Sequence, residues 1–101
     1  MLSGVRLKQK VSPLAVKLNV VGNISRLSIL YLLAHEPMSV ADIIGRVKLS
    51  APLVSHHLKK LYAAGWVRKT VYGKLVTYYL EDAAYTQIKT FILAAGLTEK
   101  K

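Results

Sequence analysis

The stretch Ser50–Tyr79, SAPLVSHHLKKLYAAGWVRKTVYGKLVTYY, decides the fold, because it predicts a helix followed without a gap by a basic hairpin. Ser50 can cap the first free backbone N–H groups, and Pro52 lies in the first turn, where no backbone donor is needed. Gly65 ends the helix, since glycine best tolerates the left-handed conformation there. Four residues of this helix recur at the spacing i, i+3, i+4 and i+7, which places them on one stripe that must face a core. They are Val54, His57, Leu58 and Leu61.

The opposite face of this helix is polar and basic. No acidic residue occurs from Ser50 to Leu80, so the face suits the negatively charged major groove of DNA. An ordinary solvated helix face has a similar composition, and the helix alone leaves that interpretation open. The residues of this face are Pro52, Ser55, His56, Lys59, Lys60 and Ala63.

After the helix the hydrophobic period changes from 3.6 to 2. Residues 66–72 and 75–80 are rich in Val, Thr and aromatic residues, and a Gly-Lys pair separates them, which predicts a two-stranded hairpin. Helices followed by a short basic hairpin form the layout of a winged helix-turn-helix, whose wing lies along the DNA backbone or minor groove. The basic residues of the hairpin are Arg68, Lys69 and Lys74.

Aromatic residues flank and line this hairpin. Tyr72, Tyr78 and Tyr79 could stack on nucleic acid, but tyrosines of a two-stranded hairpin more often pack against the sheet, and we expect packing. Trp66 is expected to fill the core beneath the wing. His57 is expected to be partly buried, with one ring nitrogen in a hydrogen bond.

Three helices are expected before this stretch, each with its own start or stop signal. The first starts at the Ser-Pro pair 12–13, the second lies within 23–37, and the third spans 39–48 with a serine cap. The short turn 48–50 fixes the third and fourth helices at a steep angle, as in a helix-turn-helix. The expected core stripe of the second helix is Leu27, Leu30, Tyr31 and Ala34.

Length and charge favour one nucleic-acid-binding domain. The 101 residues suffice for a single core, and 15 Lys and Arg against 5 Asp and Glu give a net charge of +10. A membrane-surface protein could share that charge. We expect a domain at 13–97, preceded by a basic arm at 1–12 that is either disordered or extends the first helix, and followed by a tail at 98–101.

The apolar content predicts a homodimer. The chain is 52% hydrophobic with a mean hydropathy of +0.31, and a small monomer has too little interior for that much apolar surface. A last helix, running from the Glu-Asp pair 81–82 to Ala95, is apolar on more than one face, so we assign it and the first helix to the dimer interface. The expected interface residues are Leu14, Leu18, Tyr85, Ile88, Phe91, Ile92 and Ala95.

Several classes of function are excluded or disfavoured. The absence of cysteine rules out disulfides and thiolate metal sites. No apolar run approaches the length of a membrane span, and residues 1–10 lack the apolar segment of a secretory signal, so we expect a cytoplasmic protein without membrane contact. No nucleophile, base and orienting group come together in the pattern, so we expect no enzyme and no cofactor. His56 and His57 point about 100° apart on a helix and cannot chelate one metal ion.

The order of elements and the local residues resemble the ArsR family of bacterial and archaeal repressors. The matching segments are SRLSILYLLAHEPMSVADI at 25–43, LSAPLVSHHLKKLYAAGWV at 49–67 and YGKLVTYYL at 72–80. The resemblance covers roughly 13–95 and implies a mainly α fold with a small β hairpin (α+β), with five helices and a two-stranded wing. It further implies a homodimer, built on its first and last helices, that binds an inverted repeat in double-stranded DNA and blocks transcription.

Carried over by position, the resemblance implies two sets of DNA contacts. Ser55 and His56 are the base-edge readers, with Ala51 and Leu53 beside them. Many relatives have glutamine in place of Ala51, so readout here is expected to depend less on direct contacts and more on DNA shape. The residues expected at the DNA backbone are Ser50, Lys59, Lys60, Arg68, Lys69 and Lys74.

The chain departs from the metal-sensing members of this family. They carry Glu-Leu-Cys-Val-Cys-Asp-Leu at the start of the third helix, where residues 37–43 here read PMSVADI. Asp42 alone cannot make a soft-metal site. The family's other site joins Asp and His residues on the last helices of two subunits, but this last helix contains no histidine, so no metal site is expected and the effector is unknown.

Two functions from different classes therefore stand at this point. The first is a sequence-specific dimeric DNA-binding regulator, acting as a repressor on two half-sites about one helical turn apart. The second is a basic winged-helix module whose partner is a protein or RNA, or which binds DNA without sequence preference. Salt-sensitive binding to an enriched DNA sequence separates the first from the second.

Overall fold

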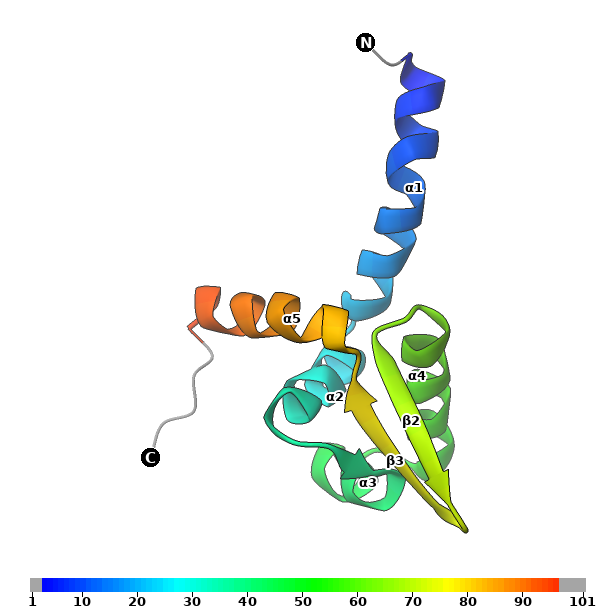
Figure 1. Ribbon diagram of the computed structural model, residues 1–101, viewed down its shortest axis with the longest axis vertical. Coiled ribbons are helices and arrows are strands. Elements are labelled where there is room, and N and C mark those ends of the chain that lie inside the picture. Colours follow the sequence, from blue (N-terminus) through cyan, green and yellow to red (C-terminus); the bar gives the residue numbers. More distant parts are fainter. Residues whose placement is uncertain (1–2, 97–101) are drawn as a thin grey trace.

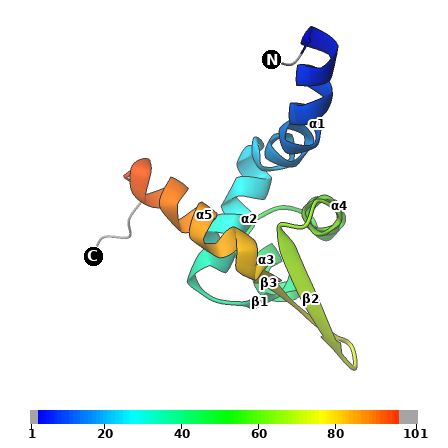
Figure 2. The same ribbon diagram turned by 45° about the horizontal axis from the view of Figure 1, so that its top comes forward.

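The computed structural model describes residues 3–96 and has five helices and a small antiparallel sheet, which confirms the predicted winged helix-turn-helix (Figure 1). Helices α2, α3 and α4 gather beside the hairpin, while α1 and α5 extend away from this body (Figure 2). The end of the predicted domain at residue 97 and the tail 98–101 lie outside the described residues. The elements are α1 Gly4–Val21, α2 Ile24–His35, β1 Met38–Ser39, α3 Val40–Val47, α4 Ala51–Ala63, β2 Val67–Tyr72, β3 Leu75–Leu80 and α5 Asp82–Ala94.

Helix α1 starts earlier than the predicted Ser-Pro pair. Its N-cap is Ser3, whose hydroxyl accepts a hydrogen bond from the backbone N–H of Arg6 at 3.2 Å, and Pro13 lies inside the helix. Residues 4–12 thus extend the first helix and do not form a separate arm. An interior proline removes one helical hydrogen bond, but good helix formers and a serine cap precede it here, so the helix continues through Pro13.

The core face of α2 is broader than the predicted stripe. Asn23 caps this helix, with its side-chain oxygen 3.0 Å from the backbone nitrogen of Arg26. Leu27 is exposed and Tyr31 is only half-buried, so their assignment to the core was wrong. The helix packs against α3, α4, α5 and β3 on several sides, which one 3.6-residue stripe does not anticipate. Its buried residues are Ile29, Leu30, Leu33 and Ala34.

The helix-turn-helix forms as the caps predict. Ser39 caps α3 through the backbone N–H of Asp42, and Ser50 caps α4 through that of Leu53, at 3.1 and 3.3 Å. Lys48 in the turn between them has φ 58° and ψ 43°, a left-handed conformation. Gly65 has φ +81°, as expected after the end of α4. The predicted stripe of α4 is buried at Val54, Leu58 and Leu61, and half-buried at His57.

The sheet contains a strand that the sequence did not predict. Its order is β1-β3-β2, all antiparallel, with Met38 opposite Tyr78 and Ser39 opposite Thr77. Two residues are too short to show an alternating pattern, so β1 leaves no signal in the sequence. The predicted hairpin is confirmed, with Gly73 at φ +61° in its two-residue turn.

Trp66 is buried beneath the wing, as expected. Its indole Nε1 donates a hydrogen bond to the Lys17 carbonyl of α1 at 2.9 Å, and the Lys17 Nζ lies 5.0 Å from the ring centroid. Tyr78 is also buried, and Tyr79 is half-buried. Tyr72 is largely exposed in contrast, so the expected packing of that ring was wrong.

Within residues 3–96, no single helix has the length and apolar content needed to cross a membrane. Helices α1 and α2 meet those two criteria only when taken together, and the chain bends by 84° between them.

Candidate nucleic-acid interface

The exposed face of α4 gathers the residues expected to read bases. Ala51, Leu53, Ser55 and His56 are exposed in the first half of the helix, and the expected phosphate contacts Lys59 and Lys60 are exposed in the second half. The Ser50 hydroxyl accepts the backbone N–H of Leu53, which leaves its own proton free to donate to an anion. One helix face therefore combines hydrogen-bonding groups near its N-terminus with positive charge further along.

Polar contacts hold the inner side of α4 in place. The Arg26 Nη1 lies 3.3 Å from the His57 Nδ1, and the Arg26 Nε donates to the carbonyl of Val20 at the end of α1. Because the guanidinium is a donor, the His57 Nδ1 accepts in this contact. Burial, the charge of Arg26, and the neighbouring His56 and Lys60 lower the pKa of His57. The lowered pKa favours the neutral ring, which accepts from Arg26 on the side of α4 that faces the protein.

Arg26 was missed by the sequence analysis. It follows the cap of α2 by three residues, a position at which an arginine is usually exposed to solvent. Its partners, Val20 and His57, lie six and thirty-one residues away in the chain. No local spacing indicates such a contact.

The wing carries its cations beside α4. The Lys69 Nζ lies 4.9 Å from the centroid of the Tyr62 ring on α4, which connects the wing to the helix. The Arg68 guanidinium carbon lies 4.4 Å from the Tyr79 ring centroid on the other face of the hairpin. Lys74 is exposed in the turn. In Figure 1 the hairpin runs back along α4, so that its tip lies toward the end where α4 begins.

The residues expected at a dimer interface fall into two groups. Most are accessible: Leu14, Leu18, Tyr85, Phe91 and Ala95 are exposed, and Ile92 is half-buried. Ile88 is only 1% exposed and belongs to the core of the protomer, so its assignment to the dimer interface was wrong. It faces inward because α5 packs against α2 along that side.

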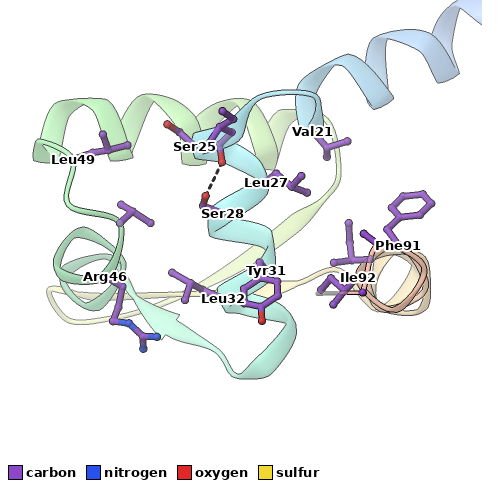
Figure 3. A pocket seen from close by; sticks show the side chains of 15 residues that line it. Val21, Ser25, Leu27, Ser28, Tyr31, Leu32, Arg46, Leu49, Phe91 and Ile92 are labelled. Atoms are coloured by element: carbon purple, nitrogen blue, oxygen red, sulfur yellow. Dashed lines mark hydrogen bonds between the residues drawn. The ribbon is translucent and has the colours of Figure 1, made fainter. Parts of the chain in front are cut away.

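A large apolar groove lies between α2 and α5, bordered by α3 (Figure 3). Its volume is about 1000 Å³. Leu27 lines the groove on the side of α2 that faces α5, where Ile92 lies, and Leu32 lines it on the side that faces α3, with Arg46 at the rim. The groove therefore continues onto the apolar face of α5 at Phe91, Ile92 and Ala95.

No metal centre is evident in the part of the chain that the structure describes. Residues 3–96 contain no group of three or more His, Cys, Asp or Glu side chains placed to hold a metal ion. The rings of His56 and His57 have centroids 5.9 Å apart and are tilted by 57° to each other.

Comparison with known proteins relates the helix-turn-helix to a family of regulators. A sequence profile described as "Bacterial regulatory protein, arsR family" matches residues 24–69, from α2 into β2. A search of curated proteins found no match.

Three solved structures illustrate the likeness of the fold. The transcriptional regulator HlyU from Vibrio vulnificus is 27% identical, with 88% of this chain and 94% of that chain covered and a TM-score of 0.75. NolR from Sinorhizobium fredii is 26% identical, with 94% of each chain covered and a TM-score of 0.82. The homodimeric winged helix-turn-helix DNA-binding domain of Mb0332 from Mycobacterium bovis is 21% identical, with 94% and 87% covered and a TM-score of 0.77.

The profile match over the helix-turn-helix, the likeness to a transcriptional regulator along most of the chain, and the wing beside α4 agree with one another. Residues 24–69 thus match the ArsR family of bacterial regulatory proteins, most of the chain resembles winged helix-turn-helix transcriptional regulators, and the sequence contains no cysteine.

Proposed function

We propose that this DNA-binding regulator is a homodimeric repressor that binds an inverted-repeat operator. The observation that carries the proposal is the exposed face of α4, on which Ser55, His56 and Lys59 stand beside the cations of the wing. No acidic residue interrupts the sequence between Asp42 and Glu81. A repressor of this kind works where the chromosome lies, which in bacteria is the cytoplasm.

Binding combines contacts to base edges with contacts to phosphates. Ser55 and His56 meet base edges in the major groove, where their hydrogen-bonding groups discriminate between base pairs. Lys59 and Lys60 on α4 meet phosphates, together with Ser50 and the wing residues Arg68, Lys69 and Lys74, and fix the register of the protein on the duplex. Ala51 and Leu53 offer only apolar contact, so direct readout is limited and the shape of the operator contributes to specificity.

The dimer is proposed from surface that the protomer leaves uncovered. Leu14 and Leu18 on α1 and Tyr85 and Phe91 on α5 are exposed large apolar residues. The groove of about 1000 Å³ adjoins α5, and a contiguous apolar region of this kind marks an association surface. The winged helix-turn-helix domain of Mb0332, which has the same fold, is homodimeric and supports a dimer here. A two-fold dimer presents two copies of α4 to the two half-sites of a palindrome.

Selection of DNA from a random library by the purified protein tests the proposal, with binding repeated at two salt concentrations. We expect an enriched inverted repeat, bound by two protomers with an affinity that falls as salt rises. Binding that ignores both sequence and salt would refute it. The assignment as a repressor is checked by placing the selected site in a promoter, where the protein should lower transcription.

Two variants test the division between base and phosphate contacts. His56→Ala should relax the base preference at one position of each half-site, whereas Lys74→Ala should weaken binding to all sequences alike and lower the salt slope. The measurement is the affinity for the selected site and for random duplex at several salt concentrations. Equal losses on both duplexes for both variants would contradict the assigned roles.

A further inference from the structure

The tip of the wing is apolar and uncovered, which the proposed backbone contacts do not explain. Val71, Tyr72 and Leu75 are 63%, 83% and 54% exposed. All residues of β2 after Val67 are exposed, so the outer half of the hairpin projects beyond the core without cover on either face. Contiguous exposed apolar side chains are a feature of interaction sites.

The strand register arranges these side chains as a thin wedge. Tyr72 stands opposite Leu75 and Val71 opposite Val76, and directly opposed residues share a face. Each face of the tip therefore ends in an apolar pair. Gly73 has φ +61°, and no heavy atom beyond those of Gly73 and its two chain neighbours lies within 4 Å of the point where a Cβ would stand. Because Tyr72 pairs with Leu75, only the two turn residues lie beyond this pair.

The charge around the wedge indicates what it meets. Lys74 follows the turn glycine, and Lys69 lies two residues before Val71, so cations flank the apolar pairs. Lys69 also contacts the Tyr62 ring of α4, which directs the hairpin along the recognition helix. An apolar tip between cations matches a surface in which phosphates border apolar sugar and base edges, which is the minor groove of DNA.

We propose that the wing tip is a DNA-deforming wedge, in which Tyr72 and Leu75 enter the minor groove beside each half-site and partly unstack one base step. The inference rests on the proposed operator binding and adds a site to it. Apolar side chains inserted into the minor groove of other proteins kink the duplex at the step they enter. Pyrimidine–purine steps unstack most easily, so the selected operator should carry one at the position reached by the tip.

The test compares the wild-type protein with a Tyr72→Ser/Leu75→Ser double variant on the selected operator. 2-Aminopurine replaces adenine at the step flanking each half-site, because its fluorescence rises when stacking is lost. We expect wild-type protein to raise the fluorescence and the double variant not to. The variant should also lose affinity by about tenfold to a hundredfold, the range expected for lost contacts between side chains and bases, with the salt slope unchanged.

Two control variants separate the wedge from charge and from folding. Thr70→Ala alters the same exposed face two residues nearer the core and should leave affinity and fluorescence unchanged. Lys74→Ala should lower the salt slope but keep the fluorescence rise. All variants should keep the wild-type unfolding temperature, because the altered side chains lie outside the core.

The outcomes distinguish this inference from the proposed function. If wild-type protein binds the operator and the double variant binds equally well with the same fluorescence, the wedge is refuted and operator binding stands. If wild-type protein selects no DNA sequence, operator binding and the wedge both fail.

Discussion

Helices α1 and α4 differ in what holds them to the protomer. None of the residues 4–21 of α1 is buried, whereas α4 buries Val54, Leu58 and Leu61 almost completely in a shorter helix. Figure 1 shows α1 extending away from the body and α4 lying against it. The orientation of α4 is therefore set within one protomer, while most of α1 has no partner among residues 3–96.

The contacts that α1 does make are concentrated at its C-terminal end and lead to the DNA-binding elements. The carbonyl of Lys17 accepts the Trp66 indole N–H at the start of the wing, and that of Val20 accepts Arg26, which also contacts His57 on α4. The helix proposed for dimerisation is thus joined at two points to the elements proposed for DNA binding. The comparison shows that α4 and the wing are held in place within one protomer. Their distance from the same elements of a second protomer depends on α1.

Matched leucine truncations give the largest expected contrast between the two helices. Leu58→Ala on α4 should lower the free energy of unfolding by about 2–5 kcal/mol, because it removes a buried side chain and leaves a cavity. Leu18→Ala on α1 should change the stability of the monomer little, since Leu18 is exposed. Urea unfolding measured at several protein concentrations checks both. A loss for Leu18→Ala that matches Leu58→Ala at every concentration would contradict the comparison.

Charge introduced on α1 should separate association from folding. Leu14→Lys/Leu18→Lys should give a folded monomer, because ammonium groups would be buried in the proposed interface. Operator affinity should then fall by about a hundredfold or more, because the two half-sites are no longer bound by two α4 helices joined in one dimer. Sedimentation and operator titration measure the two effects.

Gln9→Lys/Asn19→Lys is the matched control for this pair. It adds the same two charges at exposed polar positions of α1 and should leave the dimer intact. A monomer from both pairs, or a dimer from both, would remove Leu14 and Leu18 from the interface.

The same contrast explains what could be predicted from the sequence. The caps Ser39 and Ser50 and the end at Gly65 are local signals, and each marks the helix boundary it predicted. The start of α1 was missed because Pro13 gives a strong local start signal, although the helix had already begun at Gly4. Strand β1 was missed because its pairing depends on β3, some forty residues away.

The candidate site was predictable to the same extent. Exposure of Ser55, His56, Lys59 and Lys60 follows from the 3.6-residue period of α4, and the structure agrees with it. The Arg26 contact was not predictable, since it joins residues of three elements. The exposure of Tyr72 was not predictable either, because a hairpin pattern does not indicate how far the packed helices extend along the strands.

His57 gives a smaller, pH-dependent way to test how α4 is held. Its pKa is lowered from 6.5 by burial and by Arg26, His56 and Lys60, so below that pH the unfolded chain binds more protons than the folded one. The contribution to stability is therefore complete above the unfolded pKa and is lost as pH falls through the interval down to the folded pKa. We expect the free energy of unfolding to fall more steeply in wild type than in His57→Gln as the pH decreases below about 7.

Urea unfolding of wild type and His57→Gln at several pH values measures the two slopes. Equal slopes for wild type and His57→Gln would show that the contact with Arg26 does not depend on a neutral ring.

The smallest expected effect concerns the turn that joins α3 to α4. Lys48 is the only residue other than glycine with a positive φ among residues 3–96, at 58°. A side chain in this conformation raises the energy of the folded state, whereas glycine avoids that strain but loses more chain entropy on folding. Lys48→Gly should therefore change the free energy of unfolding by less than about 1 kcal/mol, and Lys48→Val should lower it clearly, since a β-branched residue is a poor fit there. Thermal unfolding of the two variants measures the difference. Because the turn joins α3 and α4, which pack within one protomer, that difference should not depend on protein concentration.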